Sequence, residues 1–229
     1  MRGALGRKTP TDWAHVEKYP LSALRPRELP VAVPGVLGLN WYTGFDTPER
    51  IGNSYFIGRD FGRVRGGHAI CAKPPTVTDL VAWQRFYDQL AEGACVGYSC
   101  SRLMTLLNRK RYEAKWLYTR AQETDEFANT PPEEGTSVRA GFDILLNEGL
   151  KTVWGSGSFG PYLREGIAAY RWATTWDEVR QALGVPDSAN SVPLVNSWGT
   201  SYPHVVHLVD EAGERLLAEE GEFGLVTDR

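Results

Sequence analysis

The sequence has few of the side chains that catalyse reactions or bind metals: three cysteines and four histidines in 229 residues. An odd, small number of thiols argues against the disulfide framework of a small secreted domain and is typical of a reducing compartment. No Cys-x-x-Cys and no His-x-x-x-His spacing occurs. We therefore expect no zinc site and no cofactor.

The sequence also lacks a strong charge of either sign and a long apolar run. Its formal net charge is −3 and its pI is about 5.9, whereas nucleic-acid-binding domains usually carry a basic excess. The most apolar stretch, residues 29–39, is interrupted by Pro34 and Gly35, and a membrane span needs about 20 apolar residues. No apolar segment of a secretory signal follows Met1. We expect a cytoplasmic protein with no nucleic-acid and no membrane partner.

What is present is an ordinary globular composition, 42% hydrophobic with eight tryptophans, in a chain long enough for one large domain or two lobes. Four prolines within residues 1–30 predict an extended N-terminal arm. Alternating apolar patterns predict strands at 31–42, 54–58, 63–72, 192–196 and 204–209. Helical spacing predicts helices at 79–86, 95–108, 115–122, 137–149, 176–184 and 212–220. Strands flank a central helical block, so the predicted fold class is α+β.

The three cysteines have different surroundings in the sequence. Cys100 lies on the apolar face of its predicted helix, and Cys71 points away from His68 because strand faces alternate; both are typical of buried packing thiols. Cys95 lies in the first turn of the predicted helix, off the apolar face. Free amides and the helix dipole there favour the thiolate. The position alone leaves packing and nucleophilic roles equally open.

Three other sequence features indicate a catalytic site when they are considered together with Cys95. Gln89 precedes it by six residues, and a side-chain amide beside a helix-start amide makes a two-donor oxyanion hole. The run Asn-Ser-Trp-Gly at 196–199 supplies a carbonyl that can orient an imidazole and an indole that can shield that bond from water. Two glycines before His68 let another segment approach its strand closely.

This combination resembles the papain-like (C1) cysteine proteases, in the form found in bacteria and phages. Gln89, Gly93 and Cys95 match the family's nucleophile motif, followed by Val-Gly-Tyr-Ser. His68, in Gly-His-Ala-Ile, matches the family's histidine strand, and Asn196 opens the family's Asn-Ser-Trp-Gly motif with Trp198 beside it. The resemblance covers most of residues 31–205.

The resemblance implies a two-lobe fold and a set of site residues. A helical lobe would carry the cysteine, and a β-rich lobe would carry the histidine and the asparagine. The catalytic residues would be Cys95, His68, Asn196 and Gln89, with Trp198 and Gly93 in support. The predicted helix at 137–149 resembles the one beside the family's cleft, which implies substrate contacts for Gly135, Thr136 and Ser137.

The sequence departs from the family pattern in three respects. Val96 replaces the tryptophan after the nucleophile, and Glu92 replaces a disulfide-forming cysteine. The order along the chain is also His, Cys, Asn instead of Cys, His, Asn. Circular permutation cannot produce this order, but insertion of one lobe into the other can, because catalysis depends on geometry and not on chain order. The predicted divisions are a β-rich lobe over 31–72 and 192–229, the latter with a C-terminal helix, and an inserted helical lobe over 73–191.

His204 and His207 are the rival candidates for the base. They follow Asn196 by eight and eleven residues and would avoid the unusual chain order. The family has only a structural strand there, so we favour His68. His15 lies in the arm and is the weakest candidate.

The expected function is that of a cysteine peptidase, in which a Cys95 thiolate paired with a His68 imidazolium cleaves a peptide or protein substrate. One alternative is a non-catalytic, virion-associated part of a phage-like assembly, whose protein partner would order the chain termini. The other is an amidase or transpeptidase that acts on cell-wall peptides.

Overall fold

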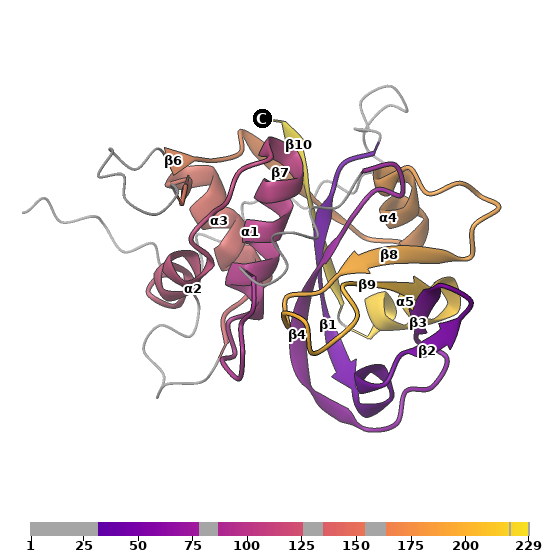
Figure 1. The fold of residues 1–229 in the computed structure, drawn as a ribbon. Helices are drawn as coiled ribbons and strands as arrows, with labels where there is room; N and C mark the ends of the chain where they lie inside the picture. The colour runs from indigo at the N-terminus through magenta and orange to yellow at the C-terminus, as the bar shows by residue number, and fades with distance from the viewer. Residues whose placement is uncertain (1–31, 78–86, 126–134, 154–163, 220, 229) are drawn as a thin grey trace, which may run out of the picture.

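The computed structural model describes residues 32–77, 87–125, 135–153, 164–219 and 221–228 (Figure 1). Within these residues five α-helices accompany an eight-stranded sheet, and the predicted α+β class is confirmed. No helix in the same ranges is long and apolar enough to cross a bilayer. The predicted arm over 1–30, with His15, and the predicted helix over 79–86 lie outside the described residues.

The large sheet has the strand order β2-β3-β9-β8-β4-β1-β10-β7. Neighbouring strands are antiparallel except for the parallel pair β3 and β9. The strands are β1 (Gly35–Tyr42), β2 (Glu49–Ile51), β3 (Ser54–Ile57), β4 (Val64–Ala72), β7 (Ala169–Ala173), β8 (Ser191–Val195), β9 (Val205–Val209) and β10 (Glu222–Asp228). A short 3-10 helix, η3 (Thr43–Asp46), follows β1, and a separate small sheet pairs β5 (Leu150–Lys151) with β6 (Arg164–Glu165).

The helices are α1 (Cys95–Asn108), α2 (Ala114–Gln122), α3 (Val138–Asn147), α4 (Trp176–Leu183) and α5 (Asp210–Ala218). All five were predicted from helical spacing, and their termini carry sequence signals. The Ser137 hydroxyl accepts a hydrogen bond from the Ala140 amide at the start of α3. Thr175 and Glu178 form a capping box at the start of α4, which ends at Gly184 with φ +63°.

Strand β1 is central and is buried on both faces. Val36 packs into a core with residues of α1 and α3, whereas its neighbour Leu37 packs into a second core with residues of α4 and α5. Figure 1 shows α1, α2 and α3 on one side of β1 and β4, and α4 and α5 on the other. The molecule therefore has three layers, with the sheet in the middle.

Strands β4 and β8 are adjacent in the sheet although more than one hundred residues separate them. Cys71 pairs with Val195, and Ala72 pairs with Leu194. The segment predicted as one helical lobe, 73–191, thus leaves and re-enters the sheet between two neighbouring strands. Only its first part forms the α1–α3 layer, because β7 pairs with β10 and α4 packs on the opposite face of the sheet.

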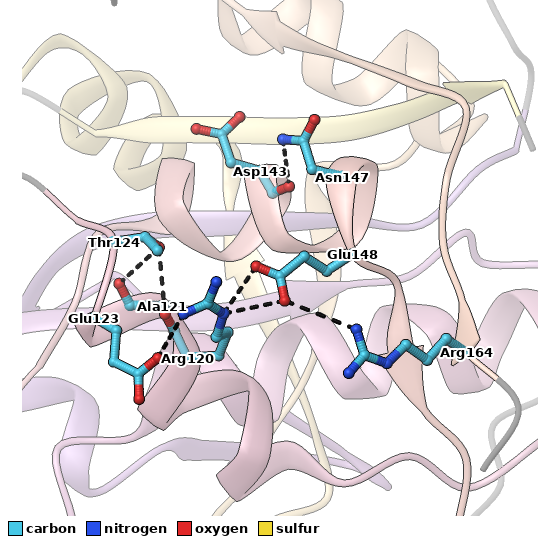
Figure 2. Close-up of polar contacts among 8 residues, drawn as sticks. All are labelled: Arg120, Ala121, Glu123, Thr124, Asp143, Asn147, Glu148 and Arg164. Atoms are coloured by element: carbon cyan, nitrogen blue, oxygen red, sulfur yellow. Dashed lines mark hydrogen bonds and ion pairs between the residues drawn. The ribbon is translucent and has the colours of Figure 1, made fainter. Parts of the chain in front are cut away.

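An ionic network joins the outer helices of the α1–α3 layer (Figure 2). The Arg120 guanidinium on α2 donates to the Glu148 carboxylate after α3 at 2.8 Å and to Glu123 at 2.6 Å. The Nη1 atom of Arg164 on β6 lies 3.9 Å from the Oε2 atom of Glu148. These groups are partly exposed, so the network fixes the relative position of α2 and α3 more than it stabilises the fold.

Candidate active site

Cys95 is the first residue of α1, and the start of that helix packs directly on β4. The Ser99 hydroxyl donates to the Ala69 carbonyl at 2.8 Å, and the Ala69 backbone acts on the Cys95 thiol by lowering its pKa. The carbonyl of one β4 residue is therefore bound by the first turns of α1. This arrangement places the thiol beside the residue that follows His68.

Burial controls the ionisation of Cys95. The side chain is only 9% exposed, and this burial raises the pKa of the thiol above its usual value. The amides of Ala69, Val96 and Cys95 itself lower the pKa, but by less. The helix-start position that favours a thiolate is thus outweighed by loss of water, and the thiol is neutral at pH 7 in this state.

His68 projects from β4 into a cage of aromatic rings. The imidazole centroid lies 4.7 Å from the Trp198 ring, with 30° between their planes, and 4.8 Å from the Trp41 ring, with 71° between their planes. His68 is 7% exposed, and burial lowers its pKa from 6.5 to about 3. Its Nε2 atom is buried and has no hydrogen-bond partner among the described residues. The imidazole is therefore neutral and can accept a proton.

Asn196 immediately follows β8 and is 1% exposed. Its backbone amide donates to the His204 carbonyl at 3.0 Å, and its side-chain oxygen accepts from the Trp198 amide at 3.1 Å. Its Nδ2 atom is buried without a partner in the described ranges. The carboxamide shapes the turn that carries Trp198 over His68, and no hydrogen bond from His68 to Asn196 occurs in this state.

Gln89, in the loop before α1, forms hydrogen bonds to the turn that follows β8. Its Oε1 accepts a hydrogen bond from the Ser197 hydroxyl at 2.7 Å, and its backbone amide donates to the Ser197 carbonyl at 2.9 Å. Its Nε2 donates to the Glu92 carbonyl at 3.2 Å, which uses one of its two hydrogens. The loop before α1 and the loop after β8 are thus locked together next to Cys95.

These segments line an open cavity of about 700 Å³, a volume within the range of ligand sites. Four of the predicted site residues line it: His68, Gln89, Gly93 and Trp198. The other walls are formed by the loop before α1, by the exposed part of β4 and by aromatic side chains. These further lining residues include Arg65, Gly66, Gly67, Asp88, Glu92, Trp41, Asp46 and Tyr202.

Two predicted catalytic residues do not line this cavity within the described part of the chain. Cys95 and Asn196 are both buried, and neither is among the described residues that line it. The rival bases His204 and His207 are also absent from the lining of the cavity. His207 on β9 packs on Phe56 on β3, with 5.2 Å between their ring centroids.

The three residues predicted for the substrate cleft lie elsewhere. Gly135 receives a hydrogen bond from Gln122 at 3.2 Å and donates to Tyr118 at 3.3 Å, so it is held by α2. Thr136 donates to Asp125, and Ser137 caps α3. None of the three is among the described residues that line the cavity.

Sequence reasoning missed Trp41, Asp46 and Tyr202 as parts of the site. Trp41 is opposite Gly66 in the β1–β4 register, and its indole N–H donates to Asp46 at 2.9 Å. The Tyr202 hydroxyl donates to the Phe45 carbonyl at 2.7 Å. The only sequence signal for this aromatic wall was the high tryptophan content, which does not say where the rings meet.

No group of three or more His, Cys, Asp or Glu side chains in the described ranges could hold a metal ion. The three cysteines are free thiols. Comparisons of the chain with protein-family models, with curated proteins and with solved structures find no match. The resemblance to papain-like proteases therefore rests on the sequence motifs alone.

The burial of His68 predicts that the fold weakens in acid. Its pKa is about 3 in the folded chain and about 6.5 when unfolded, so below pH 6.5 the unfolded chain binds a proton that the folded chain excludes. The free energy of unfolding should fall by about 1.4 kcal/mol per pH unit between pH 6.5 and 3 from this group alone. Urea unfolding at pH 7 and pH 5 measures the effect, and His68→Gln should remove it. Equal pH dependence in both proteins would contradict the prediction.

Proposed function

We propose that the chain is a papain-like cysteine hydrolase that cleaves peptide bonds, with Cys95 as nucleophile and His68 as base. The observation that carries the proposal is the shared use of β4. Ala69 binds the first turns of α1 through its carbonyl, and the residue before it turns its imidazole into the cleft beneath Trp198. Nucleophile, base and cleft are thus fixed to one another by adjacent residues.

The reaction starts from a neutral pair, so substrate binding has to raise the basicity of His68 or lower the pKa of the Cys95 thiol before the proton moves. His68 accepts the proton of the Cys95 thiol, and the resulting thiolate attacks the carbonyl carbon of the substrate. The oxyanion that forms is held by the Cys95 amide and by the second Nε2 hydrogen of Gln89. The carbon–nitrogen bond then breaks, His68 gives its proton to the leaving amine, and water hydrolyses the thioester by the same route.

Asn196 is assigned the role of orienting His68. Among the described residues, the His68 Nε2 and the Asn196 Nδ2 are both buried without partners. The Asn196 oxygen accepts from the Trp198 amide in this state, so it would have to leave that amide in order to accept the N–H of a protonated imidazole. This rearrangement would accompany protonation of His68, when the ring needs an acceptor.

The free backbone of Gly67 supports a peptide as the substrate. Backbone groups alternate in direction along a strand, so the peptide group of Gly67 points to the same side as that of Ala69, away from β1. Ala69 meets α1 there, whereas β8 pairs only with Cys71 and Ala72. Within the described part of the chain, Gly67 therefore offers an unpaired N–H and C=O to the cleft, which suits an extended polypeptide.

The two-lobe arrangement with an inserted helical lobe is part of the proposal. Its support is the pairing of β4 with β8, which are adjacent strands separated in sequence by the α1–α3 layer. Glu92, at the position of the family's disulfide cysteine, forms an ion pair with Lys115 at 2.7 Å. A reducing compartment such as the cytoplasm fits this replacement and three free thiols.

A non-catalytic role in a phage-like assembly is the second candidate. It is favoured by the burial of the Cys95 thiol and of the His68 Nε2 atom, both of which limit access for a substrate. An amidase or transpeptidase would use the same thioester and differ only in the acyl donor and in the amine that accepts it. Product analysis with cell-wall peptides distinguishes these two from a peptidase.

Labelling with an epoxide probe for cysteine proteases tests the proposal. We expect one adduct, on Cys95, in the native chain, since Cys71 and Cys100 are fully buried. Peptide mapping by mass spectrometry should find the same adduct in Cys71→Ala and Cys100→Ala and none in Cys95→Ala. His68→Asn should slow the labelling strongly because the base is lost. Equal labelling rates in the native chain and in His68→Asn would favour the non-catalytic role.

A further inference from the structure

The Asp46 carboxylate lies at the end of η3 and holds two residues of the cleft wall. Its Oδ1 accepts a hydrogen bond from the Trp41 indole at 2.9 Å, and its Oδ2 accepts one from the Arg65 guanidinium at 2.7 Å. Trp41 is on β1, and Arg65 is on β4, three residues before His68. Asp46 thus connects both strands that flank the predicted base.

Trp41 lies on the same face of the sheet as His68. It is directly opposite Gly66 in the register, and Leu39 is opposite His68, so the indole lies diagonally across from the imidazole. Its ring lies 4.8 Å from His68 and 5.0 Å from Trp198 between centroids, with interplanar angles of 71° and 86°. With its N–H bound by Asp46, the indole packs against both rings in T-shaped contacts.

We propose that Asp46 is a positioning residue: by binding the indole N–H of Trp41, it holds that ring against His68 and keeps water from the imidazole. The effect on the reaction rests on the proposed function, whereas the effect on the state of His68 does not. Without the carboxylate, the buried indole N–H would lose its acceptor and turn towards water. The wall beside His68 would then open.

No charge acts directly on His68 in this arrangement. The titratable groups on the segments around it are Cys95 on α1, Asp46 in η3, Arg65 on β4, Asp88 and Glu92 in the loop before α1, and Tyr202 after β8. Burial is the cause of the low His68 pKa. A loosened Trp41 should therefore act through solvation and raise that pKa towards 6.5.

Titration of the His68 ring by NMR in the full chain tests the inference without reference to activity. In Asp46→Ala the midpoint should rise by about one pH unit or more, since one wall of the cage is lost. Asp46→Asn should restore the low midpoint, because the carboxamide oxygen still accepts the Trp41 N–H. The matched control is Glu49→Ala, which removes an exposed ion pair with Arg59 on the β2–β3 hairpin and touches none of the rings.

The possible outcomes separate the inference from the proposed function. An unchanged His68 midpoint in Asp46→Ala would overturn the inference, as would an equal rise in Asp46→Ala and Asp46→Asn, which would point to charge instead of the hydrogen bond. If the chain hydrolyses peptides, the acid limb of kcat/KM should move up with the NMR midpoint in Asp46→Ala. A chain that neither hydrolyses peptides nor takes up the epoxide probe would refute the proposed function and leave the NMR result standing.

Discussion

Replacing Cys95 by serine is expected to lower the rate of peptide hydrolysis by about six orders of magnitude, to the background of the assay. The substitution exchanges one atom at the start of α1, so the hydrogen bonds that dock this helix on β4 remain available. The neutral imidazole of His68 has a pKa of about 3 and is too weak a base to activate an alkanol. Release of new amino termini from an unfolded protein substrate, followed over hours, measures the loss.

Cys100→Ala is the matched control for this variant. Cys100 lies five residues further along α1, is fully buried and faces α3. Its loss removes a thiol from the same helix and should leave kcat/KM unchanged, with a small decrease in melting temperature from the missing sulfur. Hydrolysis by Cys95→Ser at the rate of the native chain would show that the nucleophile lies elsewhere.

The local parts of this site could be predicted because each depends on a short stretch of sequence. The apolar spacing of residues 95–108 predicts a helix that begins at Cys95, and α1 has these bounds. The strand pattern before Asn196 places this residue at the end of β8. A helix start and a strand end are both defined within a few residues, so no knowledge of the partner segments is required.

The ionisation state of the thiol could not be predicted in the same way. From the sequence, the helix start favours a Cys95 thiolate and an ion pair with a His68 imidazolium. In the folded chain, β4 and the rings of Trp41 and Trp198 remove water from both groups, and burial shifts each pKa towards the neutral form. Burial depends on which segments meet in space, and this information is not local.

The strands at the far side of the sheet were missed for a related reason. Residues 169–173 alternate between small, aromatic and charged side chains, and residues 222–228 follow directly on a charged helix. Neither segment has a clear period of two, yet each pairs well with the other at the sheet edge. Their pairing brings α4 to the face opposite α1, which divides the segment 73–191 between two layers of the fold.

The unusual order of the three motifs follows the course of the chain through the sheet. His68 and Asn196 both lie beyond the Cys71–Val195 pair, on the same side of the point at which β4 and β8 pair, and Cys95 enters from the segment between the two strands. Both ends of that segment are anchored in one sheet, so its insertion need not disturb the contacts of the base. The order His, Cys, Asn is therefore compatible with the geometry that a cysteine hydrolase needs.

Removal of the Gln89 amide donor is expected to lower kcat/KM by roughly 10²–10³-fold. Two variants separate its role in the oxyanion hole from its role in joining two loops. Gln89→Ala loses both the amide donor and the acceptor of the Ser197 hydroxyl. Gln89→Glu keeps an oxygen for the Ser197 hydroxyl but has no N–H for an oxyanion. If the donor matters, both variants should lose activity to a similar extent, mainly in kcat.

A glutamine outside the cleft provides the control for the added charge. Gln181 lies on the exposed side of α4, so Gln181→Glu adds the same charge far from Cys95 and should leave kcat unchanged. Steady-state kinetics with one fluorogenic peptide compares all four proteins, and thermal unfolding reports whether the loop before α1 has loosened. A Gln89→Glu variant with nearly native kcat beside an inactive Gln89→Ala would mean that Gln89 joins the loops and does not bind the oxyanion. A large loss in both, with the melting temperature preserved in Gln89→Glu, would place its Nε2 at the developing negative charge.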